Sequence, residues 1–393
     1  MNQKSFTLFD DVKIREQLLP FTYTRSIADI RIGINTIKEK WQHFLNLKGI
    51  DISTANYLQT KYHSSAANST FINACVIPSG NLVKSILALN DDEYLSHDHL
   101  IIAIADTKDE RYESKKEVKY NSEIDFIERP WDIYKKNEKV LTDDFNTLTK
   151  GRTSQKISAT NTIIGDVNRI FIEEGASVEA SILNSQTGVI YVGKDAEIME
   201  GSMIRGPLAM CEHSAIKLGG KIYGATTLGP HVKVGGEVNN SVIFGFSNKG
   251  HDGFLGNSVI GEWCNLGADT NNSNLKNNYG NVKVWSYQEK QEVETGLQFC
   301  GLFMGDHSKC GINTMFNTGT VVGVSANIFG AGFPDKHVPS FSWGGADQMI
   351  EFKLDKAIEV AEKMMERRGI LLSEIDLTIL KYIYEQSKEY RTK

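Results

Sequence analysis

The sequence has little of what would place it in several common classes of protein. Its 393 residues include seven prolines and five cysteines, and no two cysteines form a CxxC pair. Scattered cysteines in odd number are typical of reduced thiols, so we expect a cytoplasmic protein without disulfides. No stretch approaches the roughly 18 apolar residues of a membrane span. The N-terminus has no basic segment before an apolar run, so we also expect no signal peptide.

Positive charge is not in excess either, since the net charge is −6. A nucleic-acid binder would usually carry a basic surplus, so we expect no such partner. The length instead predicts two or three domains, large enough to bury a core without covalent cross-links.

Glycine is scarce outside the middle of the chain. Of 34 glycines, 30 lie between Gly151 and Gly345. Glycine is costly inside helices and useful at turns, so this segment is expected to be a turn-dense β structure, unlike its flanks.

The same segment has an apolar residue at every sixth position. The clearest run is Val192, Ile198, Ile204, Met210, Ile216, Ile222, Leu228 and Val234. A period of six fits a coil with three flat faces, in which the sixth residue points inward and a small residue turns the corner. This predicts a parallel β-helix of hexapeptide repeats, left-handed as in known members, against the alternative of an irregular β-sandwich. We interpret a phase break between Val234 and Val242 as a two-residue insertion.

The flanks have other patterns. Residues 30–44 have the apolar spacing of an amphipathic helix, and residues 100–105 form a short apolar run typical of a buried strand. The tail after Ala346 has a helical apolar stripe that ends at Gly369. We therefore predict an α/β domain over 1–155, a β-helix over 156–345 and a helical tail over 346–393.

The densest cluster of chemically useful residues runs from Lys249-Gly250-His251-Asp252-Gly253-Phe254 through Asn265-Leu266-Gly267-Ala268-Asp269-Thr270 to Asn274. In this spacing the chain resembles the bifunctional N-acetylglucosamine-1-phosphate uridyltransferase/glucosamine-1-phosphate acetyltransferase family, the GlmU type. The N-terminal segment Leu8-Phe9-Asp10-Asp11 and the later segment Arg129-Pro130-Trp131 resemble a divergent branch of this family that is seen in the Bacteroidetes.

The resemblance implies an acetyltransferase that takes acetyl-CoA and an amino sugar phosphate. His251 would be the general base, a role that suits imidazole at neutral pH. The Ala268 amide would polarise the thioester carbonyl, Asn265 would orient the sugar, and Asn274 would line the same site. Glu237 stands at a position where the family pattern also has an acidic residue.

At two positions the sequence departs from the family pattern, and this changes the side chains that are available to bind the substrate. Phe254 stands where the family has a tyrosine, and Asn239 stands where it has a phosphate-binding lysine. The sugar phosphate then needs other cations. The candidates are Arg205, Lys249, Lys276 and Lys283. The alternative for each of them is an ordinary solvated surface charge. A different amino sugar phosphate therefore stays open as the acceptor.

Three histidines have the spacing of a column. His213 and His231 are 18 residues apart, one full coil, and His251 follows one coil plus the supposed insertion later. We expect all three on one outer face, as an aligned surface column, as the lining of the acyl-transfer cleft, or as a metal site. Because metal ligation usually needs three supported ligands, we predict no metal there.

The N-terminal domain would, by the same resemblance, transfer a uridylyl group from UTP with Mg²⁺. Such chemistry needs backbone amides that hold phosphate and a carboxylate that holds metal. No glycine occurs before Gly33, so the Gly-rich loop of the family is absent. Arg25 is the candidate remnant of that loop and the candidate nucleotide-binding residue. Asp106 is the candidate metal ligand or a plain turn carboxylate.

The favoured hypothesis is a cytoplasmic homotrimeric acetyltransferase that feeds nucleotide-sugar and cell-wall synthesis and also couples its product to UTP. The alternative is a sugar-1-phosphate nucleotidyltransferase whose β-helix only trimerises or senses ligand. A non-enzymatic scaffold is the third.

Overall fold

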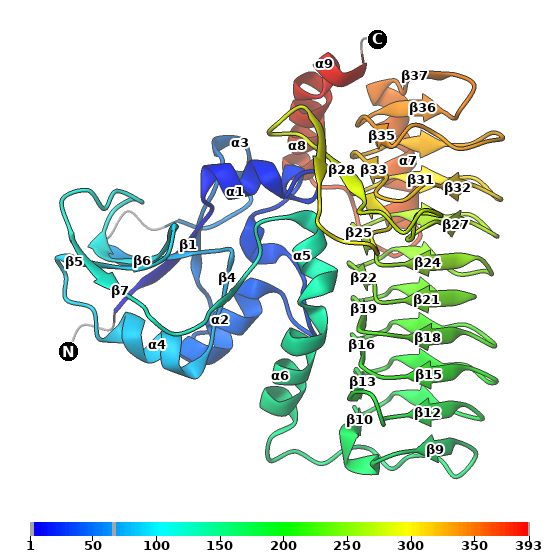
Figure 1. Ribbon diagram of the computed structural model, residues 1–393, viewed down its shortest axis with the longest axis horizontal. Helices are drawn as coiled ribbons and strands as arrows, with labels where there is room; N and C mark the ends of the chain where they lie inside the picture. Colours follow the sequence, from blue (N-terminus) through cyan, green and yellow to red (C-terminus); the bar gives the residue numbers. More distant parts are fainter. Residues whose placement is uncertain (1–3, 65–67, 392–393) are drawn as a thin grey trace. The chain divides into compact units, whose positions relative to one another are not determined.

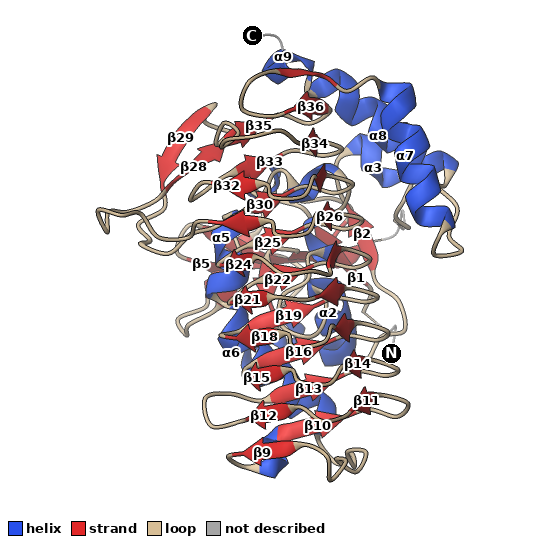
Figure 2. Ribbon diagram, turned by 90° about the vertical axis from the view of Figure 1, so that its right-hand side faces the viewer, coloured by secondary structure: helices blue, strands red, loops and turns tan. Residues whose placement is uncertain are grey.

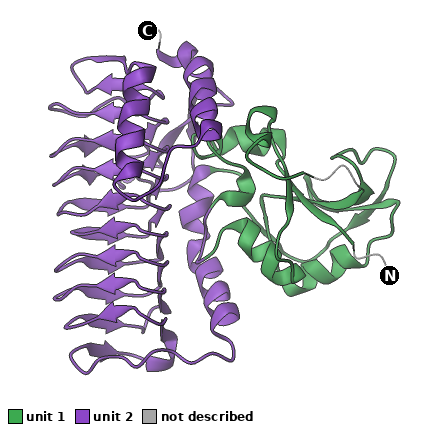
Figure 3. Cartoon of the chain, turned by 180° about the vertical axis from the view of Figure 1, so that it is seen from behind, with its two compact units in different colours: residues 1–30, 35–129 green, residues 31–34, 130–393 purple. Residues whose placement is uncertain are grey.

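The computed structural model describes residues 4–64 and 68–391. The chain divides into two compact units, residues 1–30 with 35–129, and residues 31–34 with 130–393 (Figures 1 and 3). Each unit has its own core and is described by itself. None of the helices in the described ranges is long and apolar enough to cross a membrane.

The first unit is an α/β layer built on a six-stranded sheet of order β2-β1-β3-β6-β5-β7. The sheet strands are β1 (Phe6–Phe9), β2 (Asp51–Ser53), β3 (Ser69–Asn73), β5 (Glu93–His97), β6 (Leu100–Thr107) and β7 (Lys116–Lys119). A separate pair is formed by β4 (Val76–Ile77) and β8 (Asp125–Phe126), and the helices are α1 (Val12–Gln17), α2 (Ile37–Leu45), α3 (Asn56–Gln59) and α4 (Gly80–Leu87).

The predicted strand over 100–105 is present as β6, and the predicted helix over 30–44 begins later than expected. It starts at Ile37 because Thr36 caps it with a capping box, in which the Thr36 hydroxyl accepts from the Glu39 amide. The residues before Thr36 are extended or turned, although their apolar spacing also fits a helix.

The second unit is a three-sided parallel β-helix, whose strands stack coil upon coil along three faces (Figure 2). The first face holds β9 (Thr162–Ile164), β12 (Ile182–Asn184), β15 (Met203–Arg205), β18 (Lys221–Tyr223), β21 (Glu237–Asn239) and β24 (Phe254–Gly256), and is continued by β27 (Asn271–Asn272) and β32 (Met315–Phe316). The second face holds β10 (Ile170–Ile172), β13 (Ile190–Val192), β16 (Leu208–Met210), β19 (Thr226–Leu228), β22 (Val242–Ile243), β25 (Val259–Ile260), β30 (Phe303–Met304), β33 (Val321–Val322) and β35 (His337–Val338).

The third face holds β11 (Ser177–Val178), β14 (Glu197–Ile198), β17 (Ala215–Ile216), β20 (Lys233–Val234), β23 (Asn248–Lys249), β26 (Asn265–Leu266), β31 (Lys309–Cys310), β34 (Asn327–Ile328) and β36 (Ser342–Gly344). An antiparallel strand, β37 (Met349–Glu351), closes it. The predicted fold class, an α/β domain with a left-handed parallel β-helix and a helical tail, is confirmed.

The inward residues of the three faces form one continuous apolar core. Residues of the period of six, such as Ile216, Ile222 and Leu228, point into it and are at most 1% exposed. Burial of such a stack in every coil stabilises the solenoid in proportion to the apolar area removed from water.

The predicted insertion near Val234 is wrong, because the coil is shorter there. Ile216 pairs with Val234 on the third face, and Val234 pairs with Lys249 only 15 residues later. The corner after Val234 has two residues, Gly235 and Gly236, where the coil before uses the four residues 217–220. Gly236 has φ +68°, a conformation that glycine adopts without a Cβ penalty.

Two helices cover the outer side of the second face. These are α5 (Pro130–Lys135) and α6 (Asn137–Thr149). Leu141 and Phe145 of α6 pack with Phe171 and Tyr191, whose side chains leave the face outward. The contacts thus group residues 130–153 with the β-helix rather than with the α/β layer.

The tail forms helices α7 (Leu354–Glu366), α8 (Glu374–Gln386) and α9 (Lys388–Arg391). Helix α7 buries the predicted stripe at Ala357, Ala361 and Met365, and the turn after it uses Gly369 at φ +69°. A hairpin of β28 (Lys283–Ser286) and β29 (Gln291–Glu294) leaves the coil between β27 and β30.

Candidate functional site

The His251 imidazole lies at the corner between the third and first faces. This corner, residues 250–253, joins β23 to β24, and its backbone is tied to the next coil because the Asp269 amide donates to the Asp252 carbonyl over 3.0 Å. His251 is exposed, as the sequence predicts for a reactive group. No residue in the described part of the chain hydrogen-bonds or ion-pairs with its ring, so one chain by itself leaves the imidazole without an orienting partner.

Ala268 lies at the equivalent corner one coil further on. Its carbonyl accepts from the Asn313 amide over 2.8 Å, whereas its own amide donates to no acceptor in ranges 4–64 and 68–391. A half-buried amide that the fold leaves unused is the donor that a developing oxyanion needs. The corners that carry His251 and Ala268 follow each other directly along the solenoid.

Lys249 does not reach the surface, because the shortened coil turns it into the core. It occupies the inward position of β23 opposite Val234 and is only 2% exposed. Its Nζ donates to the carbonyls of Gly235, over 3.0 Å, and His251, over 2.9 Å. Burial lowers the pKa of this ammonium to about 8, although the nearby Asp252 and Asp269 oppose the effect. The structure therefore places Lys249 beneath the His251 corner and out of reach of a sugar phosphate.

Asn265 lies on the third face and Phe254 and Glu237 lie on the first, so the His251 corner stands between them. Glu237 and Phe254 are register neighbours, and Glu237 accepts a hydrogen bond from the Tyr223 hydroxyl over 2.5 Å. Burial, and then this bond to Glu237, raise the pKa of Tyr223 to about 12. Arg205 is exposed on the same face, two strands before Glu237.

The other predicted binding residues lie in the excursion between β27 and β30. The Asn274 amide nitrogen donates to Asn257 Oδ1 over 2.8 Å, which holds the loop start against the coil. Lys276 Nζ donates to the Asn281 carbonyl, and Lys283 is 3.5 Å from Glu294 across the hairpin. The structure therefore engages both lysines within the excursion instead of gathering them at the His251 corner.

The predicted histidine column is right for two members and wrong for the third. His213 and His231 stack with ring centroids 4.8 Å apart at the corner between the second and third faces. The column continues through Phe246 at 4.9 Å and Trp263, 4.2 Å further on, and not through His251. The three-residue shortening of the coil puts Phe246 at the stacking position, whereas an insertion would have put His251 there.

No three His, Cys, Asp or Glu side chains within 4–64 and 68–391 lie together as metal ligands. Asp106, at the end of β6, is exposed with φ +40°, and no second carboxylate joins it in such a group. The residues present do not fit a Mg²⁺ site, and we derive no step through that ion.

The segment after β1 holds no open phosphate cradle. The Asp11 carboxylate accepts from the Ile14 amide and so caps the short helix α1 itself. Arg25 is 4% exposed, and its Nη1 donates to the Phe21 carbonyl over 3.4 Å. Asp10 is buried and accepts from Ser26 and the Ile27 amide.

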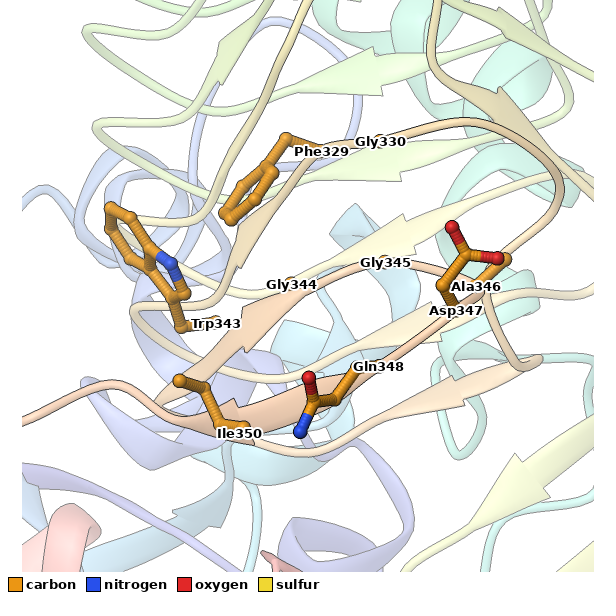
Figure 4. A pocket seen from close by; sticks show the side chains of 9 residues that line it. All are labelled: Phe329, Gly330, Trp343, Gly344, Gly345, Ala346, Asp347, Gln348 and Ile350. Atoms are coloured by element: carbon orange, nitrogen blue, oxygen red, sulfur yellow. The ribbon is translucent and has the colours of Figure 1, made fainter.

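A shallow pocket of about 300 Å³ lies at the last coil. Phe329, Trp343 and Ile350 line its apolar side and Asp347 and Gln348 its polar side (Figure 4). None of the residues predicted from the sequence as a site contributes to it.

Stacked coils of three short parallel strands define this chain as a hexapeptide-repeat β-helix protein joined to an α/β unit. Residues 6–153 match the family model described as sugar nucleotidyl transferase. The chain is 29% identical over 228 residues to the bifunctional protein GlmU of Methanocaldococcus jannaschii, covering 58% of this chain and 49% of that protein. It is 29% identical over 164 residues to a bifunctional sugar-1-phosphate nucleotidylyltransferase/acetyltransferase of Sulfurisphaera tokodaii, covering 41% and 40%. The predicted resemblance to the GlmU type is confirmed at this level of similarity.

The matched region spans about half the length of these curated relatives or less. Among solved structures, the polySia-specific acetyltransferase NeuO aligns with 53% of this chain and 94% of its own, at 13% identity and a TM-score of 0.29. The Francisella novicida UDP-N-acetylglucosamine acyltransferase aligns with 58% and 76%, at 14% identity and a TM-score of 0.26.

Sequence reasoning missed a group of cations that the fold assembles on the third face. Lys217 and Lys233 stand next to Ile216 and Val234, two inward residues of the period of six, and Arg367 and Arg368 come just before Gly369 at the end of the helical stripe. A search for cations beside the inward residues of successive coils would have found the first two.

Proposed function

We propose that this chain is a transferase that moves the acetyl group of acetyl-CoA to the amine of a hexosamine 1-phosphate, with glucosamine 1-phosphate as the favoured acceptor. The observation that supports it best is the pairing of an exposed imidazole, His251, with an unused amide, Ala268, at successive corners of the solenoid. The names of the curated relatives, which include nucleotidylyltransferase and acetyltransferase, favour the same chemistry.

In the proposed reaction the acceptor amine attacks the thioester carbonyl while neutral His251 removes the amine proton. Negative charge develops on the carbonyl oxygen, and the Ala268 amide donates to it. When the tetrahedral intermediate collapses, the C–S bond breaks and the imidazolium returns its proton to the departing thiolate. The products are the N-acetyl sugar phosphate and CoA, so protons and charge balance. Asn265 would orient the sugar from the third face.

We propose a homotrimer in the cytoplasm as the working form. The His251 ring has no orienting partner within the described residues of one chain, and a base held by a neighbouring group is a better catalyst. One flat solenoid face is also too open to enclose two substrates, whereas a neighbouring solenoid would form the second wall.

The test is a thiol-release assay with acetyl-CoA and a panel of amino sugar 1-phosphates. His251→Ala should lower kcat about 10²- to 10⁴-fold, the usual contribution of a general base. His213→Ala removes an exposed histidine from another corner and should leave the rate unchanged. Full acetyl transfer by folded His251→Ala, or equal losses in both variants, would refute the role of His251.

A second candidate function, transfer of a nucleotidyl group to a sugar 1-phosphate, is favoured by the family match over residues 6–153. The β-helix would then serve trimerisation or ligand sensing. UTP-dependent pyrophosphate release by the full chain tests it. Release that persists in His251→Ala would support this activity, and no release with any sugar 1-phosphate would exclude it for UTP.

A further inference from the structure

Four cations meet where the tail crosses the third face of the β-helix. Lys233 leaves β20 outward and has Asn248 as its register neighbour on β23. Arg368, at the end of α7, donates from Nη2 to Asn248 Oδ1 over 3.2 Å, which places its guanidinium beside that strand. Lys217 follows Ile216, the register neighbour of Val234. From strand spacing and rise, Lys217 and Lys233 start roughly 8 Å apart.

The four charges lack counter-charges within 4–64 and 68–391. No carboxylate forms an ion pair with Lys217, Lys233, Arg367 or Arg368 there, and the one polar contact of Lys217 Nζ is with Met199 Sδ at 3.9 Å. The pKa of Lys233 is lowered by burial and then by Arg368 and Lys217. The pKa of Arg368 is lowered by burial and then by Arg367.

The other titratable groups near this cluster do not neutralise it. Glu197 lies on the same face two strands before Lys233 and opposes the lowering of its pKa only in part. Glu212 faces His231, whose own pKa is lowered by burial, by His213 and by Arg368. Like charges held close together without an anion are unfavourable, and Lys233 and Arg368 are also partly buried, so the fold maintains a positive potential at this strand surface.

We propose that Lys217, Lys233, Arg367 and Arg368 form a binding site for a phosphate monoester. Guanidinium groups bind phosphate oxygens with directed hydrogen bonds, and the two ammonium groups add mobile point charges. The inference rests on the proposed function in one respect, that the phosphate belongs to a substrate of acetyl transfer. The chain has the uncharged Asn239 on the first face, where its family resemblance leads one to expect a phosphate-binding lysine, so a substrate phosphate needs cations from another part of the chain.

The site lies next to the proposed catalytic corner along the chain. Asn248, which Arg368 contacts, is three residues before His251, and Lys233 is on the neighbouring coil. A phosphate held here belongs either to the sugar 1-phosphate or to the 3′-phosphate of CoA, and both present the same dianion.

The first measurement is calorimetric titration of the full chain with inorganic phosphate. The double variant Lys233→Gln/Arg368→Gln should weaken binding at least about tenfold, and Arg368→Lys should recover part of the loss. Lys363→Gln, on the same helix but paired with Glu359, is the matched control and should bind like the wild type. Circular dichroism confirms folding of each variant.

The second measurement assigns the source. A rise in KM for the sugar phosphate with unchanged kcat in the double variant indicates the acceptor. A rise in KM for acetyl-CoA that is absent for its 3′-dephospho analogue indicates the donor. No phosphate binding by the wild type, or equal binding by folded double variant and control, would overturn the site. Failure of acetyl transfer with phosphate binding intact would instead overturn the proposed function and leave the site standing.

Discussion

Lys249→Met should change how the stability of the protein depends on pH. Lys249 is 2% exposed inside the β-helix, and burial lowers its pKa from 10.5 to about 8. Each tenfold difference in proton affinity is worth about 1.4 kcal/mol, so the folded state carries a penalty of about 3 kcal/mol when both states are protonated. Because the unfolded chain binds the extra proton between pH 8 and 10.5, the stability of the wild type rises with pH across that window.

Urea unfolding of wild type and Lys249→Met at pH 7.5, 9 and 10.5 measures this directly. Between the lowest and the highest pH, the unfolding free energy of the wild type should rise by about 3 kcal/mol relative to that of the variant, since only the wild type has the titrating amine. Lys156→Met replaces an exposed lysine of the same unit and should follow the wild type throughout. Parallel curves for wild type and Lys249→Met would mean that the amine is not held in the apolar core.

Two further substitutions test how the second unit is held together, each by denaturant unfolding at neutral pH. Asn137→Ala should lower the unfolding free energy by about 3 kcal/mol, because the fully buried amide accepts from the Gly33 amide and donates to Ala225 and Thr227; a loss under about 0.5 kcal/mol would contradict this. Trp263→Ala should cost about 3 kcal/mol by removing the most buried ring of the stacked column, and an equal cost for the more exposed His213→Ala would show that burial does not set the effect.

The fold could be predicted because its signal repeats. Each coil repeats the requirement for an apolar residue at every sixth position, so an exception at a single residue does not hide the pattern. The predictions that failed for His251 in the ring column and for Lys249 at the surface required counting through the irregular coil after Val234. Nothing local distinguishes a short corner from an inserted residue, and the choice decides whether Lys249 or a neighbour faces the core.

The candidate site was predictable only in part. The exposure of His251 at a corner follows from its flanking glycines, and its role in catalysis stays a prediction. That Lys276 and Lys283 are engaged inside the excursion could not be foreseen, because their partners Asn281 and Glu294 are set by a hairpin. Arg368 joins the third face from a helix more than a hundred residues away.

The repeat in the sequence is sufficient to specify the three-sided coil, since inward aliphatics and small corner residues are a local requirement that is met again in every turn. Which side chains lie together across coils is set by long-range packing, because it depends on the length of each corner and on where the tail packs. Lys249 in the core, Phe246 in the column of rings and Arg368 beside Asn248 all follow from such long-range choices.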